Sequence, residues 1–174
     1  LFERPIKVGD WVVVGDKQGH VKKIKVRATE IQTFDRASVF IPNSELISQP
    51  LLNWTHADKT GRIIIPVGVA YGVETRKVRD LLLEVAAAHT SVFKSPAPSV
   101  LFKGFGDSSL SFELRAFIQD IDQVAVISSD LCFAIDATFR KNGIEIPFPQ
   151  QDVHWKDIDK LENIVKKIVG ESKK

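Results

Sequence analysis

In the first third of the chain, apolar residues alternate with polar ones along short segments separated by turn residues. This period-two pattern predicts short antiparallel strands joined by hairpins. The expected strands cover residues 11–14, 21–28, 29–34 and 38–41. A capped single helical turn is expected at 42–47, with Asn43 or Ser44 as the N-cap. Closely spaced strands of this kind favour a small antiparallel β-barrel.

The apolar spacing changes in the second half of the chain. Strands are expected at residues 62–69, 100–105 and 110–118. Apolar residues at helical spacing predict one helix after Thr75 and a second over residues 124–141. With a further strand after the second helix, the order becomes strand, helix, two strands, helix, strand. This order predicts a ferredoxin-like α+β domain with both helices on one face of its sheet.

The last strand of that domain is short. Gly143 follows the second helix as a stop signal, and residues 144–146 alternate like a brief strand. Pro147 and Pro149 prevent its continuation inside a sheet. A second extended piece then has no later strand to pair with, so it either docks on its own domain or pairs with copies of itself; we favour the copies and hence a ring. This piece comprises Gln150, Gln151, Asp152, Val153, His154 and Trp155.

The tail beyond Trp155 has apolar residues spaced three and four apart, at Ile158, Leu161, Val165 and Ile168. This predicts a helix over residues 156–174 with a heptad-like stripe. Because the stripe covers only about two heptads, the helix would be marginal in isolation. It would associate with copies, pack on its own chain or fray.

The composition sets the class of protein. The chain has 174 residues and a formal net charge of +2, too balanced to indicate a nucleic-acid-binding protein. Cys132 is the single cysteine, which excludes a disulfide framework, and it is expected to be buried in the second helix. No segment has the length and apolarity of a membrane span or signal peptide. The chain contains no methionine, so we expect a fragment with a membrane part upstream.

Candidate chemistry is sparse. The four histidines are scattered and lack metal-ligand spacing, so we expect no metal and no cofactor. The segment 105–110, Phe-Gly-Asp-Ser-Ser-Leu, is similar to the nucleophile block of a lipase/esterase family. Asp152 and His154 have the wrong spacing to activate Ser108, and a serine without its base is a poor nucleophile. A hairpin turn is the better interpretation, and we predict that the chain is not an enzyme.

One expected strand has a basic face. Lys23, Lys25 and Arg27 alternate with apolar residues. Such a strip could contact anionic lipid headgroups, nucleic acid or permeating anions. A solvated outer face explains the same alternation, and it is the simpler interpretation.

Five short motifs occur in order and together resemble the cytoplasmic part of the small-conductance mechanosensitive channel (MscS) family, in particular its larger potassium-linked members. The resemblance covers roughly residues 1–155. The motifs are Pro-Ile-Lys-Val-Gly-Asp at 5–10, Gly-His-Val with its strand at 19–24, Phe-Ile-Pro-Asn-Ser at 40–44, Val-Gly-Val-Ala-Tyr at 67–71 and Pro-Phe-Pro-Gln at 147–150.

The resemblance implies an α+β fold in four parts. These are an Sm-like β-domain at residues 1–60, a ferredoxin-like domain at 61–149, an intersubunit barrel strand at 150–155 and a C-terminal helical tail at 156–174. It further implies a homoheptamer, held in the inner membrane by N-terminal helices that are missing here. The part present would form a cytoplasmic cage through which ions and small osmolytes pass.

The same resemblance points to a segment that couples the cage to the pore helices: Phe40, Ile41, Pro42 and Asn43. Two rival functions follow from the residues. Sm-like rings bind RNA, and the basic strip would suit that, although we expect no nucleic acid. A hydrolase that uses Ser108 is the second rival.

Overall fold

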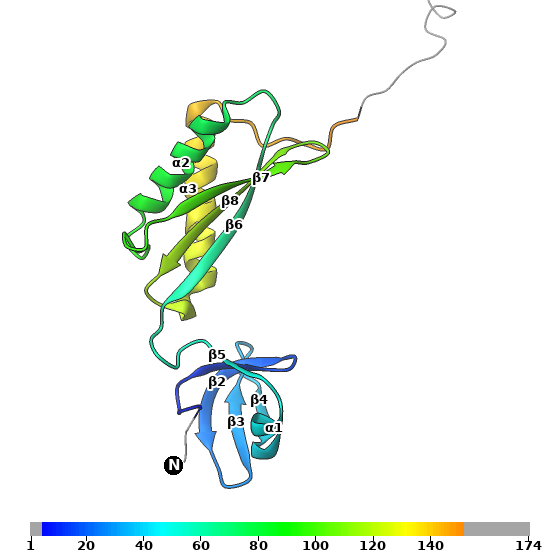
Figure 1. The fold of residues 1–174 in the computed structure, drawn as a ribbon, viewed down its shortest axis with the longest axis vertical. Helices are drawn as coiled ribbons and strands as arrows, with labels where there is room; N and C mark the ends of the chain where they lie inside the picture. Colours follow the sequence, from blue (N-terminus) through cyan, green and yellow to red (C-terminus); the bar gives the residue numbers. More distant parts are fainter. Residues whose placement is uncertain (1–4, 152–174) are drawn as a thin grey trace, which may run out of the picture.

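The computed structural model describes residues 5–151 and contains two separate antiparallel sheets in one α+β chain (Figure 1). We call residues 5–60 the N-terminal half and residues 61–151 the C-terminal half. The expected barrel strand is described only at Gln150 and Gln151. Asp152, Val153, His154, Trp155 and the expected tail helix lie outside the described residues. None of the helices in the described part is long and apolar enough to cross a membrane.

The N-terminal half contains one sheet with strand order β4-β3-β2-β1-β5 and one short helix. Gly15, with a φ of 59°, permits the tight turn between the first two strands. The elements are β1 (Trp11–Val14), β2 (Lys17–Ile24), β3 (Ala28–Gln32), β4 (Ser38–Pro42), α1 (Asn43–Ser48) and β5 (Leu51–Asn53).

This sheet differs from the predicted barrel. Among the described residues, the two outer strands, β4 and β5, do not pair with each other, so the sheet is open rather than a closed barrel. The strand predicted at 21–28 begins earlier, at Lys17, because the turn at Gly15 brings Lys17 opposite Val14. A buried cluster of seven apolar residues fills the inside of the curved sheet: Ile6, Val12, Val14, Val21, Ile31, Ile41 and Leu46.

The C-terminal half places two helices on one face of a three-stranded sheet with order β6-β8-β7 (Figure 1). Side chains of β8 alternate strictly between buried and half-buried, so one face of this strand packs against the helices. The elements are β6 (Gly61–Val69), α2 (Thr75–Ala88), β7 (Ser99–Phe105), β8 (Leu110–Ile118), the short 3₁₀ helix η1 (Ile121–Gln123) and α3 (Val124–Asn142).

The predicted ferredoxin-like order is only partly reproduced, because its fourth strand is missing from the described residues. Residues 144–146 form no strand, although Ala70 N donates a backbone hydrogen bond to Glu145 O at 2.9 Å. Gly143 does end α3, in the left-handed conformation with a φ of 66°. Pro147 follows too soon for a ladder to develop after this single bond.

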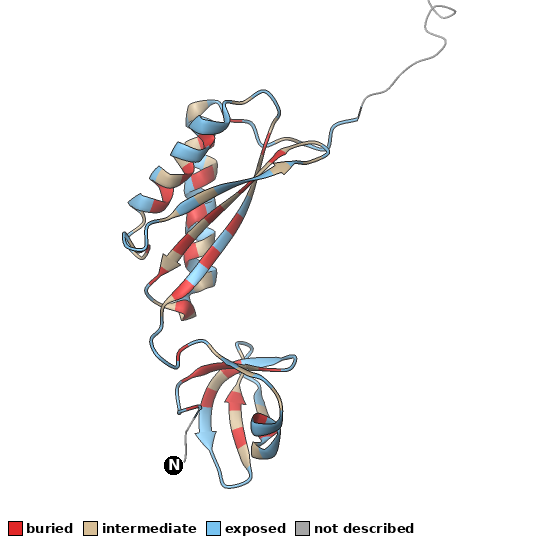
Figure 2. Ribbon diagram, in the orientation of Figure 1, coloured by how far each residue is buried: buried red, intermediate tan, exposed pale blue. Residues whose placement is uncertain are grey.

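The expectation for Cys132 was wrong. Its side chain is exposed. The buried stripe of α3 runs through Ile127, Leu131, Ile135 and Phe139, and Figure 2 shows buried positions recurring along this helix. Because successive residues of an α-helix are about 100° apart, the neighbour of buried Leu131 is rotated away from the core.

Candidate functional site

The predicted coupling segment lies where β4 meets α1. Phe40 is exposed on β4, Ile41 is buried in the core of the N-terminal half, and Pro42 is exposed at the end of the strand. The structure therefore divides the segment into one anchoring residue, Ile41, and exposed neighbours. Lys25 Nζ lies 5.1 Å from the centre of the Phe40 ring, which is a cation–π distance.

The prediction that Asn43 or Ser44 caps α1 was wrong. Neither Asn43 nor Ser44 is the N-cap of α1, because that position is Pro42 and no side chain caps the helix. Instead, Asn43 Nδ2 donates to Lys25 O at 2.9 Å and to Val26 O at 3.1 Å, and its backbone N donates to Arg27 O at 3.0 Å. Asn43 thus holds the β2–β3 connection against the start of α1.

Thr29 completes this arrangement from inside the sheet. Its side chain is fully buried, and Thr29 Oγ1 donates to Asn43 Oδ1 at 2.9 Å. A hydroxyl buried without a partner would be costly, so this bond fixes the orientation of the amide. We call Asn43, Thr29 and the backbone of residues 25–27 the asparagine clamp. The sequence signal for it was an asparagine placed directly after a strand-ending proline, which we interpreted as a cap.

A second set of polar contacts holds the N-terminal segment. Asp10 is buried, and its Oδ2 accepts from Lys7 N at 2.9 Å and from Asn53 Nδ2 at 2.7 Å. Asn53 Nδ2 also donates to Pro5 O at 3.1 Å. These bonds fix residues 5–10 beside β5, although residues 5 and 53 are far apart in the sequence.

A groove of about 630 Å³ lies between the N-terminal segment, the end of β2 and α1. Most of its lining is apolar, and two lysines, Lys7 and Lys23, contribute to it. The other lining residues are Pro5, Ile6, Val8, Ile24, Thr29, Asn43, Leu46 and Ile47. The groove therefore adjoins the asparagine clamp and the predicted coupling segment.

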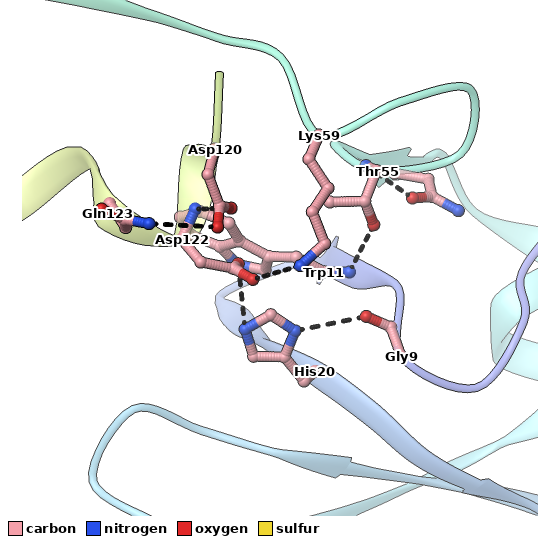
Figure 3. Close-up of polar contacts among 9 residues, drawn as sticks. Gly9, Trp11, His20, Thr55, Lys59, Asp120, Asp122 and Gln123 are labelled. Carbon is pink, nitrogen blue, oxygen red and sulfur yellow. Dashed lines mark hydrogen bonds and ion pairs between the residues drawn. The ribbon is translucent and has the colours of Figure 1, made fainter. Parts of the chain in front are cut away.

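The two halves of the chain meet at a separate polar contact, shown in Figure 3. Asp122, in η1, has one carboxylate oxygen 3.2 Å from Lys59 Nζ and the other 3.2 Å from His20 Nε2. The backbone N of Ile121 donates to Lys59 O at 2.8 Å. We call His20, Lys59 and Asp122 the interdomain joint. It is invisible to sequence patterns because its members come from β2, the linker and η1.

Electrostatics favour the charged form of Lys59 at this joint. The hydrogen bond that Lys59 Nζ donates to Asp122 is the main cause that raises the pKa of Lys59, and the charges of Asp120 and Asp122 add to it. Trp11 packs against His20, with ring centroids 6.1 Å apart. The indole Nε1 of Trp11 is buried and has no hydrogen-bond partner among the described residues.

The predicted closure segment is described only at its start. Gln150 N donates to Ser108 Oγ at 3.0 Å, so this residue contacts the β7–β8 turn of its own chain. Gln151 is exposed. The Ser108 hydroxyl thus fixes the position of the backbone at Gln150. Separately, no group of three or more His, Cys, Asp or Glu in the described part could hold a metal.

Comparison with known proteins places this architecture among mechanosensitive channels. Residues 1–56 match the model of the mechanosensitive ion channel beta-domain, and residues 63–146 match the model of the MscS C-terminal region. The channel MscK of Escherichia coli is 43% identical over 154 residues, which are 88% of this chain and 14% of that protein. MscMJ of Methanocaldococcus jannaschii is 30% identical over 88% of this chain and 45% of its own length.

A solved structure agrees with these matches. The crystal structure of Helicobacter pylori MscS in its closed state superposes with a TM-score of 0.81 at 26% identity, over 87% of this chain and 60% of that one. The chain therefore belongs to the MscS family of mechanosensitive ion channels. It spans less than half the length of the two relatives named above.

Proposed function

We propose that the chain is the cytoplasmic vestibule of a tension-gated channel in the inner membrane. Seven copies would form a cage beneath the pore, with side portals through which ions and small osmolytes leave the cell after hypo-osmotic shock. The membrane helices would precede this chain. The family membership supports this proposal, and the matches reported above give no support to an RNA-binding ring or a hydrolase.

The domain organisation belongs to the same proposal. Residues 1–60 would be an Sm-like β-domain, residues 61–149 a ferredoxin-like domain, residues 150–155 a strand of an intersubunit barrel and residues 156–174 a helical tail. The strand order β4-β3-β2-β1-β5, with strongly paired neighbours, supports the first assignment. The two helices on one face of β6-β8-β7 support the second.

The observation that carries the coupling role is the asparagine clamp. Tension can bias the vestibule only if some contact differs between the closed and open states. The backbone on the C-terminal side of the exposed Phe40 is held by Ile41 in the core and by Asn43 in the clamp. An exposed aromatic residue on a backbone fixed in this way would transmit a displacement of the pore helices to the sheet.

Patch-clamp recording of the parent channel tests this role. We expect Phe40→Ser to shift the tension threshold or the rate of inactivation. Phe133→Ser is the matched control, since Phe133 is also an exposed phenylalanine but lies on α3. Equal thresholds and inactivation rates for wild type and Phe40→Ser would contradict the coupling role.

Closure of the cage has its own test. Deletion of residues 150–155 from the parent channel should destabilise the oligomer, because it removes the proposed strand pairing between sibling subunits. Native mass spectrometry in detergent measures the subunit number directly. An unchanged oligomer would contradict the closure role of this segment and leave the coupling role to its separate test.

A further inference from the structure

The end of the N-terminal half that points away from the C-terminal half combines positive charge with exposed apolar side chains. Figure 1 shows the β2–β3 connection and α1 on this side, with the described N-terminal segment nearby. Three exposed cations at the end of β2 and in the β2–β3 connection belong to it: Lys23, Lys25 and Arg27. Lys7 lies beside them along the groove, with its Nζ 3.4 Å from His56 O. We call these four residues, with Val26 and Ile47, the basic end.

The charges of the basic end are only partly balanced within the described residues. None of its four cations forms an ion pair with a carboxylate there. Two carboxylates belong to the neighbouring elements: Glu30, opposite Lys23 in the strand register, accepts from Ser38 Oγ, and Glu45 accepts from Gln49 Nε2. Both keep their negative charge, and the four cations outnumber them. The surface therefore presents a net positive potential to whatever lies beyond it.

The apolar side chains of the basic end are unusually exposed. Val26 is 97% exposed and Ile47 is 84% exposed. Val26 is also held rigidly at the tip of its hairpin, because the asparagine clamp binds the carbonyls of residues 25–27. Rigid aliphatic side chains ringed by basic residues are typical of surfaces that insert into the headgroup region of a membrane.

The same details disfavour RNA as the partner. Single-stranded nucleic acids are bound by aromatic side chains on which bases stack. The exposed apolar residues of the basic end are aliphatic. The neighbouring aromatic ring, Phe40, has the Lys25 ammonium over it. Charge and shape together therefore favour a lipid surface.

We propose that the basic end binds the anionic surface of a phospholipid bilayer directly. The four cations would contact lipid phosphates, while Val26 and Ile47 would insert among the upper acyl carbons. The groove beside them, which Lys7 and Lys23 help to line, would accept part of a lipid chain. This inference goes beyond the vestibule role and does not require a cage, so each can fail without the other.

Co-sedimentation of the purified 174-residue chain with vesicles tests the inference. We expect binding to vesicles of equal parts phosphatidylglycerol and phosphatidylcholine, weakening as salt is added, and little binding to phosphatidylcholine alone. Lys23→Gln with Lys25→Gln should weaken binding at least tenfold, because each basic residue near an anionic surface contributes about fivefold. Val26→Ser should weaken it by a smaller factor without changing the net charge.

The matched control removes two exposed lysines from the C-terminal half, Lys94→Gln with Lys141→Gln, so that the net charge changes equally. Circular dichroism confirms folding of each variant. Equal losses for the two double variants, or no binding to anionic vesicles at low salt, would overturn the proposal. A third result would also overturn it: single-stranded RNA displaces the vesicles at matched phosphate concentration, and Val26→Ser has no effect on vesicle binding. That pattern identifies a nucleic-acid site.

Discussion

The C-terminal half contains eighteen buried apolar residues in one cluster between two helices and a sheet, whereas the cluster of the N-terminal half has seven. The smaller half compensates with buried polar contacts. Asp10, Thr29 and Thr55 are its buried polar residues, and each makes a hydrogen bond to another element or to a nearby loop. The two halves of one chain are therefore stabilised in different ways.

This difference has a functional meaning. Apolar burial is non-directional, whereas a buried hydrogen bond requires defined donor and acceptor positions and is costly when broken. The predicted coupling segment, the groove and the basic end all belong to the half that is fixed by hydrogen bonds. We infer that the N-terminal half keeps its loops in place, and the C-terminal half supplies the bulk of the stability.

The largest effect is expected from Phe139→Ala. Phe139 is 1% exposed in the core of the C-terminal half, and loss of a buried phenylalanine costs about 3–5 kcal/mol. Urea unfolding followed by circular dichroism at the helical minimum measures it, because the two long helices lie in that half. Phe133→Ala on the same helix is the control; its ring is 73% exposed, and we expect a change within about 0.5 kcal/mol.

Tryptophan fluorescence in a Trp155→Phe background tests whether the two halves unfold independently. The two remaining tryptophans, Trp11 and Trp54, both belong to the N-terminal half. If Phe139→Ala lowers the unfolding midpoints measured by circular dichroism and by fluorescence equally, the two halves unfold as one cooperative unit. The separation of roles between the halves is then wrong. If the fluorescence midpoint is retained, the halves are energetically distinct.

An intermediate effect is expected from Asn43→Ala. This change removes two side-chain donors and leaves the buried Thr29 hydroxyl without its acceptor, which should cost about 1–3 kcal/mol in the fluorescence-monitored transition. Ser44→Ala is the adjacent control at an exposed position. A loss for Ser44→Ala as large as that for Asn43→Ala would mean that helix capping, not the clamp, is the source of stability.

Sequence patterns predicted the strands and helices well where one face is buried. The alternation in β8 and the stripe of α3 are direct consequences of packing against a single apolar layer. Closure of the sheet could not be predicted in this way, because alternation is the same in open and closed sheets. The exposure of Cys132 was missed since a helix rich in apolar residues on several sides gives a weak signal.

The candidate site was only partly predictable. The motif at Phe40–Asn43 drew attention to the junction of β4 and α1, and its coupling role stays a prediction. The contacts that its residues make to residues 25–29 are contained in no local pattern. The interdomain joint was missed altogether, because His20, Lys59 and Asp122 are separated by dozens of residues and only the fold brings them together. Single charged residues in such positions look the same in the sequence as solvated ones.

The smallest effect is expected at the interdomain joint, where the groups are partly exposed and solvent screens their attraction. Unfolding midpoints would barely change, so an interdomain distance is the better measurement. Spin labels on the exposed Cys132 and on Gln18→Cys lie in different halves. Asp122→Asn should broaden the distribution of label distances, because it removes the negative charge that Lys59 and His20 both contact. Asp107→Asn, in the exposed β7–β8 turn, should not.

The pH dependence of the same label distance shows whether the charge of Lys59 helps to hold the two halves together. Its pKa is raised in the folded chain, first by the hydrogen bond to Asp122 and then by the charges of Asp120 and Asp122. A raised pKa means that the stabilisation is complete below the ordinary lysine value, about 10.4, and is lost as the pH rises through the folded value. Deprotonation of Lys59 should therefore broaden the wild-type distribution in that alkaline range. The label distances of Asp122→Asn provide the control. If their distribution broadens over the same pH range by as much as that of the wild type, Lys59 and Asp122 are not coupled, and the halves are held together by the linker alone.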